Sequence, residues 1–108
     1  MVSETSEQKI QELQMIEQRI HNLLMQKQQF QSQLLETETA LKELESSKEA
    51  FKIIGNIMVK TKKEDMMKDL KEKKGMYQLR IKAIEKQETD IKEKAKTMQE
   101  EVMKEMKE

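Results

Sequence analysis

Apolar side chains recur at alternating spacings of three and four residues along two long stretches of this chain. Eight of ten such positions are apolar in the first stretch, and nine of eleven in the second. A stripe kept up over so many turns is typical of a coiled coil rather than of a globular amphipathic helix. We call these positions the seam: Leu13, Ile16, Ile20, Leu23, Lys27, Phe30, Leu34, Thr37, Leu41, Leu44, then Met67, Leu70, Lys74, Tyr77, Ile81, Ile84, Glu88, Ile91, Ala95, Met98 and Val102.

Two charged residues of opposite sign interrupt the seam at similar depths. If the two helices pair antiparallel about the middle of the chain, Lys27 and Glu88 fall near one level. Polar residues at seam positions weaken a coiled coil but restrict its register. We therefore expect an ion pair between them that sets the register.

Capping signals give the expected ends of the helices. Thr5 and Ser6 are candidate N-caps of a first helix over about residues 5–47, where Ser46-Ser47 weakens the pattern. The sequence Thr61-Lys62-Lys63-Glu64 has the form of a capping box, with Thr61 as the N-cap. The second helix is expected over about residues 62–107.

Between the helices lies the one stretch without helical character, about residues 51–60. Two short β-prone runs flank Gly55-Asn56, a two-residue turn with glycine at the first position. Pairing across this turn places Ile54 opposite Ile57 and Ile53 opposite Met58.

Both faces of the predicted β-hairpin are mostly apolar, and a lone two-stranded hairpin is marginal in water and leaves two open edges. We therefore expect it to complete its sheet with other chains. The predicted oligomerisation residues are Phe51, Ile53, Ile54, Gly55, Asn56, Ile57, Met58 and Val59.

The expected fold is mainly α: a long antiparallel coiled-coil helical hairpin with one short β-hairpin between the helices, forming a single domain over residues 1–108. Composition agrees, because 35% hydrophobic and 39% charged residues supply too little apolar material for a globular core.

The outer ends of both helices carry more apolar residues than the seam needs, several of them flexible methionines. Such surface often marks a binding site. Packing against a third helix, or ordinary frayed helix ends, explains the same pattern. The candidate binding tip comprises Ile10, Leu13, Met15, Met98, Val102, Met103 and Met106.

The amino-acid sequence argues against several classes of protein. There is no cysteine and one histidine, His21, so we expect no metal site, no cofactor and no catalytic residues. No long apolar run suggests a signal peptide or a membrane span, and we expect a cytoplasmic protein that does not bind membranes.

Charge is unevenly distributed although the net charge is zero. Residues 51–82 hold ten basic and four acidic residues, whereas residues 1–50 hold five and nine. This is either a solvated helix surface or a means of orienting acidic partners. With few aromatic residues and no recognisable motif, we expect no binding of nucleic acid.

Two coiled-coil helices enclose the hairpin Gly55-Asn56-Ile57-Met58-Val59-Lys60, which is followed by Lys63-Glu64 and by Leu70-Lys71-Glu72-Lys73. Together these features resemble the archaeal β-class subunit of prefoldin. A single hairpin fits the β class, whereas the α class carries two. The resemblance covers essentially the whole chain.

This resemblance implies an ATP-independent chaperone subunit that holds non-native proteins. Its hairpin would join those of a prefoldin α subunit and other β subunits in an intersubunit β-barrel, within a hexamer of two α and four β subunits. The apolar coiled-coil tips would bind non-native client proteins and deliver them to a group II chaperonin. The alternative is a structural coiled-coil scaffold or adaptor that joins specific folded partners.

Overall fold

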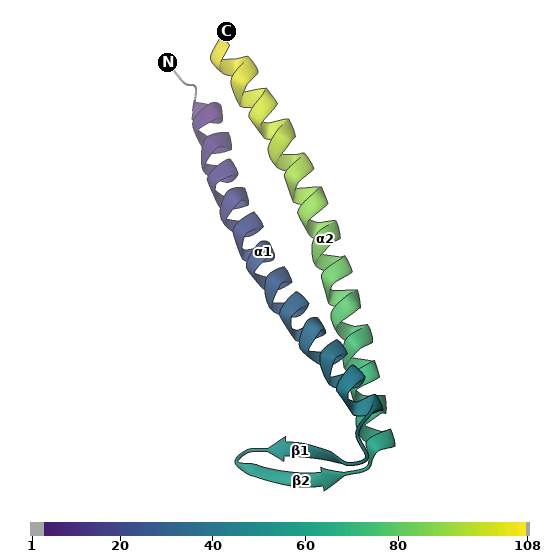
Figure 1. Cartoon of the computed structure of the whole chain (residues 1–108). Coiled ribbons are helices and arrows are strands. Elements are labelled where there is room, and N and C mark those ends of the chain that lie inside the picture. Colours follow the sequence, from purple (N-terminus) through teal and green to yellow (C-terminus); the bar gives the residue numbers. More distant parts are fainter. Residues whose placement is uncertain (1–3, 108) are drawn as a thin grey trace. The chain divides into compact units, whose positions relative to one another are not determined.

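The computed structural model describes residues 4–107 and contains two long helices with an antiparallel β-hairpin between them (Figure 1). Helix α1 spans Glu4–Glu45, strand β1 Ala50–Ile54, strand β2 Ile57–Thr61 and helix α2 Lys63–Lys107. The predicted fold class, two helices joined through one hairpin, is confirmed. The chain divides into two compact units, one of residues 1–28 with 82–108 and the other of residues 29–81.

In the first unit the two helices pair antiparallel along the predicted seam. Lys9 contacts Glu105, and Lys27 contacts Glu88, so the residue numbers of the paired positions rise along α1 as they fall along α2. Every predicted seam position of this unit is buried or half-buried. The buried apolar residues are Ile16, Leu23, Ile84, Ile91, Ala95 and Val102. Burial of this stripe drives the pairing, because each apolar side chain removed from water contributes about 1.5–3 kcal/mol.

In the second unit the seam continues through aromatic and polar layers. The rings of Phe30 and Tyr77 lie 6.2 Å apart, and the Arg80 guanidinium lies 5.9 Å from the Phe30 ring centre. Thr37 is buried, and its hydroxyl donates a hydrogen bond of 2.8 Å to the Gln33 carbonyl. That bond satisfies the hydroxyl without a partner from α2, which explains how a polar residue is tolerated in the seam.

The β-hairpin has the predicted turn and register. Ile54 pairs with Ile57, Ile53 with Met58, and Ala50 with Thr61. Gly55 has a φ of +60°, as the first central residue of a type II′ turn requires, and Asn56 does not have a positive φ. The glycine therefore permits the turn that fixes which residues face each other.

The helix bounds lie within two residues of the predicted ones, but the predicted capping residues do not cap the helices. Helix α1 ends at Glu45 because the backbone N–H and the hydroxyl of Ser47 turn back onto the carbonyls of Leu44 and Glu43. Thr61 is not the N-cap of α2: it is the last residue of β2, and the Lys62 carbonyl accepts the first helical hydrogen bond, from the Met66 N–H. Strand pairing with Ala50 holds Thr61 extended and moves the helix start beyond it.

The prediction that Thr5 or Ser6 caps the first helix is also wrong. Both residues lie inside α1, and Ser6 is only 1% exposed. Ser6 faces α2 instead of ending a helix.

Candidate interaction surfaces

The β-hairpin exposes large apolar side chains on both of its faces. Ile53 and Ile57 are 70% and 66% exposed. Ala50, where the strand leaves the helix pair, is buried. The exposed apolar residues of the hairpin are Phe51, Ile53, Ile54, Ile57, Met58 and Val59.

Within residues 4–107 the sheet consists of β1 and β2 alone, so each strand has an outer edge with unpaired backbone groups. Apolar faces and open edges together are the features of a sheet that strands from another chain can extend. The turn residues Gly55 and Asn56 are also exposed.

The structure separates the seven predicted tip residues by burial. Met15, Met103 and Met106 are exposed, and the most exposed, Met15, shows 73% of its surface. Ile10, Leu13 and Met98 are half-buried, and Val102 is buried in the seam. Three of the seven side chains are thus presented to solvent, whereas the other four lie partly or wholly within the helix pair.

A shallow groove lies beside the exposed Met15. Glu12, Met15, Ile16 and Arg19 line it from α1, and Ile91 and Lys94 from α2. Three apolar and three charged side chains line the groove, a mixture that suits an apolar segment of a polypeptide better than a small polar ligand.

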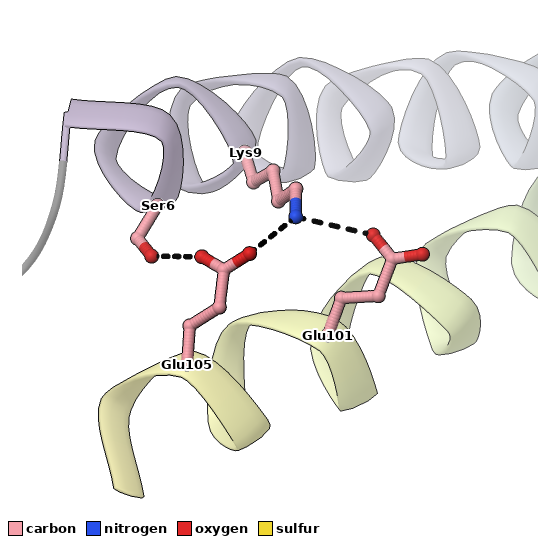
Figure 2. A network of polar contacts seen from close by, with 4 residues as sticks. All are labelled: Ser6, Lys9, Glu101 and Glu105. Atoms are coloured by element: carbon pink, nitrogen blue, oxygen red, sulfur yellow. Dashed lines mark hydrogen bonds and ion pairs between the residues drawn. The ribbon is translucent and has the colours of Figure 1, made fainter. Parts of the chain in front are cut away.

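A group of polar side chains that the apolar pattern did not predict joins the helix ends (Figure 2). The hydroxyl of Ser6 donates a hydrogen bond to one oxygen of the Glu105 carboxylate. The Lys9 ammonium lies 2.6 Å from the other oxygen and 3.4 Å from the Glu101 carboxylate. We call Ser6, Lys9, Glu101 and Glu105 the tip network.

The signal for this network was present in the spacing of the seam. Steps of four and three residues from Leu13 lead back to Lys9 and Ser6, and a step of three from Val102 leads on to Glu105. The seam therefore continues for two further positions on α1 and one on α2 with polar residues, which an apolar pattern does not reveal.

Hydrogen bonding keeps the charged forms of this network favoured. The bond from Lys9 lowers the pKa of the Glu105 carboxyl, and the bond from Ser6 lowers it further. The same contact with Glu105 raises the pKa of the Lys9 ammonium. Both side chains are therefore charged at neutral pH.

A second charged contact lies deeper in the first unit. The Lys27 ammonium is 3.2 Å from Oε1 of Glu88, and the Lys92 ammonium is 3.6 Å from Oε2. The Glu88 side chain is only 9% exposed. The predicted contact between Lys27 and Glu88 is confirmed.

The described part of the chain has neither a cluster of metal ligands nor a membrane-spanning helix. Among residues 4–107, no three His, Cys, Asp or Glu side chains lie together in a way that could hold a metal ion. No helix in that range is long and apolar enough to cross a membrane.

Two long helices that pair through a heptad seam and carry a two-stranded, doubly apolar hairpin define a coiled-coil helical hairpin protein. The model of the prefoldin subunit family matches residues 7–108. The chain belongs to the prefoldin subunit family.

Curated relatives of this chain include prefoldin β subunits. The chain is 46% identical over 66 residues to prefoldin subunit beta of Archaeoglobus fulgidus, covering 57% of each chain. It is 37% identical over 62 residues to prefoldin subunit beta of Pyrococcus abyssi, covering 55% of this chain and 53% of the relative. The matches thus span little more than half the length of these curated relatives.

A solved structure matches nearly the whole chain. The crystal structure of the prefoldin beta subunit from Thermococcus strain KS-1 superposes with a TM-score of 0.88 and 29% identity, covering 96% of this chain and 94% of that one. These comparisons confirm the resemblance to the β-class subunit of prefoldin.

Proposed function

We propose that this chain is a subunit of an ATP-independent chaperone that holds non-native proteins. The observation that carries the proposal is the exposure of Met15, Met103 and Met106 on the helix ends of the first unit. Methionine side chains are flexible and polarizable, so one such surface adapts to many apolar sequences. The seven predicted tip residues remain our candidate client-binding site.

The β-hairpin is the proposed site of assembly. A barrel closed by hairpins from several subunits removes the open edges and buries the apolar side chains of both strands. By analogy with the family, the partners are a prefoldin α subunit and further β subunits in a hexamer of two α and four β subunits. Residues 1–108 then act as one prefoldin-like domain.

The proposed mechanism is multivalent binding without chemistry. Several tips, each with weak apolar contacts, hold one client far more tightly than one tip does. The subunit would act in the cytoplasm with no cofactor and no catalysis, and pass its client to a group II chaperonin.

A substitution experiment tests the tip assignment. The triple variant Met15→Glu, Met103→Glu and Met106→Glu is assembled with an α-class subunit, and suppression of aggregation is measured by light scattering after dilution of a denatured test protein. The matched control places glutamate at three apolar residues of the second unit that are also exposed, namely Leu35, Met76 and Leu79.

We expect the tip variant to lose most of the suppression and the control to keep it, since both carry the same added charge. Equal suppression by the two variants would refute the tip assignment. No suppression by the wild-type assembly, together with a stoichiometric complex with one folded partner, would instead identify a scaffold or adaptor.

A further inference from the structure

The tip network occupies the last layers of the seam in the described part of the first unit. Lys9 and Ser6 continue the spacing of α1 beyond Leu13, and Glu105 continues that of α2 beyond Val102. Their side chains point toward one another across the two helices (Figure 2). Polar contacts thus hold the two helices together at this end of the seam.

Directly inward of this network lie the predicted tip residues that the helix pair conceals. Leu13 is the next seam residue on α1, and Val102 and Met98 are the next two on α2. Leu13 and Met98 are half-buried and Val102 is buried. Together they form an apolar surface that is largely covered while the helix ends are paired.

The exposed methionines border the same layers. Met103 follows Val102 directly, and Met106 follows Glu105, and both are 59% exposed. If the helix ends separate, the concealed residues become continuous with this exposed apolar surface. The larger surface would bind an apolar segment more tightly, because the free energy of association grows with the apolar area buried.

The ion pairs that help to keep the ends paired are partly open to solvent. The side chain of Glu101 is half exposed, and those of Lys9 and Glu105 are 24% and 33% exposed. Ion pairs open to solvent contribute little and are screened by salt, whereas an apolar layer at these positions would be held by burial. Terminal helical turns also open more readily than central ones.

We propose that the tip network is a latch over a concealed client-binding site formed by Leu13, Met98 and Val102. The closed latch keeps this apolar surface out of water when no client is present. An apolar segment of a non-native polypeptide inserts between the helix ends when the latch opens. This inference rests on the proposed holding function and adds a regulated site to it.

Two variants move the latch in opposite directions. Lys9→Glu places a third carboxylate beside Glu101 and Glu105, so the ends repel. The double variant Lys9→Leu with Glu105→Leu replaces the polar layer by an apolar one and seals the ends. Lys104→Glu is the matched control, since it makes the same charge change as Lys9→Glu at an exposed neighbour of Glu105.

Amide hydrogen exchange of residues 4–12 and 99–107 measures opening in the full chain assembled with an α-class subunit. We expect exchange about two- to fivefold faster in Lys9→Glu, the range typical of an exposed ion pair. We expect exchange at least about tenfold slower in the sealed variant, since burying leucine shifts an opening equilibrium by that order. Lys104→Glu should leave exchange unchanged.

Suppression of aggregation is measured on the same assemblies. Lys9→Glu should reach half-suppression at a lower concentration than the wild type, and the sealed variant at a higher one. A sealed variant with slowed exchange and undiminished suppression would overturn the latch, as would exchange that neither variant alters. If the wild type fails to suppress aggregation, the holding function itself fails, whatever the exchange rates show.

Discussion

The buried ion pair between Lys27 and Glu88 offers the most direct test of how this helix pair is specified. Glu88 lies between the apolar seam residues Ile84 and Ile91 of α2, and its two carboxylate oxygens face Lys27 and Lys92. The Lys27 side chain is 24% exposed, so its charge retains access to water. Replacing Lys27 by methionine removes the closer of the two positive charges and keeps the seam filled.

The magnitude follows from the distance and the burial. Two unit charges at 3.2 Å attract each other by about 5 kcal/mol at an effective dielectric constant of about 20. Desolvation of the two ions offsets most of this, so the net contribution of the pair is small. Removing one partner of a fully buried pair costs about 3–5 kcal/mol, because the other charge stays buried. Lys92 remains near Glu88, so we expect Lys27→Met to destabilise by about 2 kcal/mol.

The assay is a double-mutant cycle by urea denaturation, followed by far-ultraviolet circular dichroism at one fixed protein concentration. The double variant Lys27→Met with Glu88→Leu should be at least as stable as the wild type, since apolar residues often replace buried pairs without loss. The two sites should therefore couple by at least about 1 kcal/mol. Lys92→Met is the control and should cost under about 1 kcal/mol, because its side chain is 59% exposed.

Additive effects at Lys27 and Glu88, or a cost of Lys27→Met below about 0.5 kcal/mol, would refute this reasoning. The ion pair would then be a contact without influence on register. Conversely, strong coupling would show that the one deep break in the apolar seam of the first unit is a specificity element.

Three further predictions address the hairpin and the tip network. Ile53→Lys with Ile57→Lys should change the unfolding free energy of the unassembled chain by less than about 0.5 kcal/mol, because both side chains are exposed, yet abolish assembly in native mass spectrometry; an intact assembly would contradict the proposed barrel. Gly55→Ala should destabilise the hairpin by about 1 kcal/mol, because φ is +60° there and an added Cβ meets no atom within 4 Å, so the backbone strain alone acts. Hydrogen exchange of the hairpin amides measures this loss of stability, and unchanged exchange would be evidence against the strained turn. The folded-state pKa of Glu105 is lowered, so its stabilisation of the helix ends is present above the usual carboxyl pKa and lost as pH falls through the lowered value. The wild type and Glu105→Gln should therefore differ fully in the amide hydrogen exchange of the helix ends at pH 7, and this difference should shrink toward zero in acid. A difference that does not depend on pH would exclude the charge of Glu105 as its cause.

Periodicity carried most of the fold prediction. Each of the predicted seam positions is buried or half-buried, including the polar Lys27, Thr37 and Glu88. A heptad pattern succeeds here because side chains three and four residues apart share one helix face, whatever the partner is. The hairpin register was predictable for a similar reason, since a two-residue turn leaves one way to pair the strands.

Local signals failed where tertiary contacts competed with them. Thr61 has the sequence form of a helix cap, but pairing with Ala50 holds it in a strand. Ser6 also looks like a cap, but it lies within α1 and contacts Glu105, which is 99 positions away in the chain. Capping rules consider only residues a few positions apart, so they do not predict this contact.

The sequence by itself determined the elements of this protein, the face that each helix buries and the register of the hairpin, because these depend on residues a few positions apart. Only the tertiary structure decided which predicted tip residues are presented to solvent. Ile10 is half-buried and Met15 is exposed, although both were candidates for the same surface and neither is a seam residue. The tip network was likewise decided there, because polar side chains join a seam only when the opposite helix brings them a partner of matching charge.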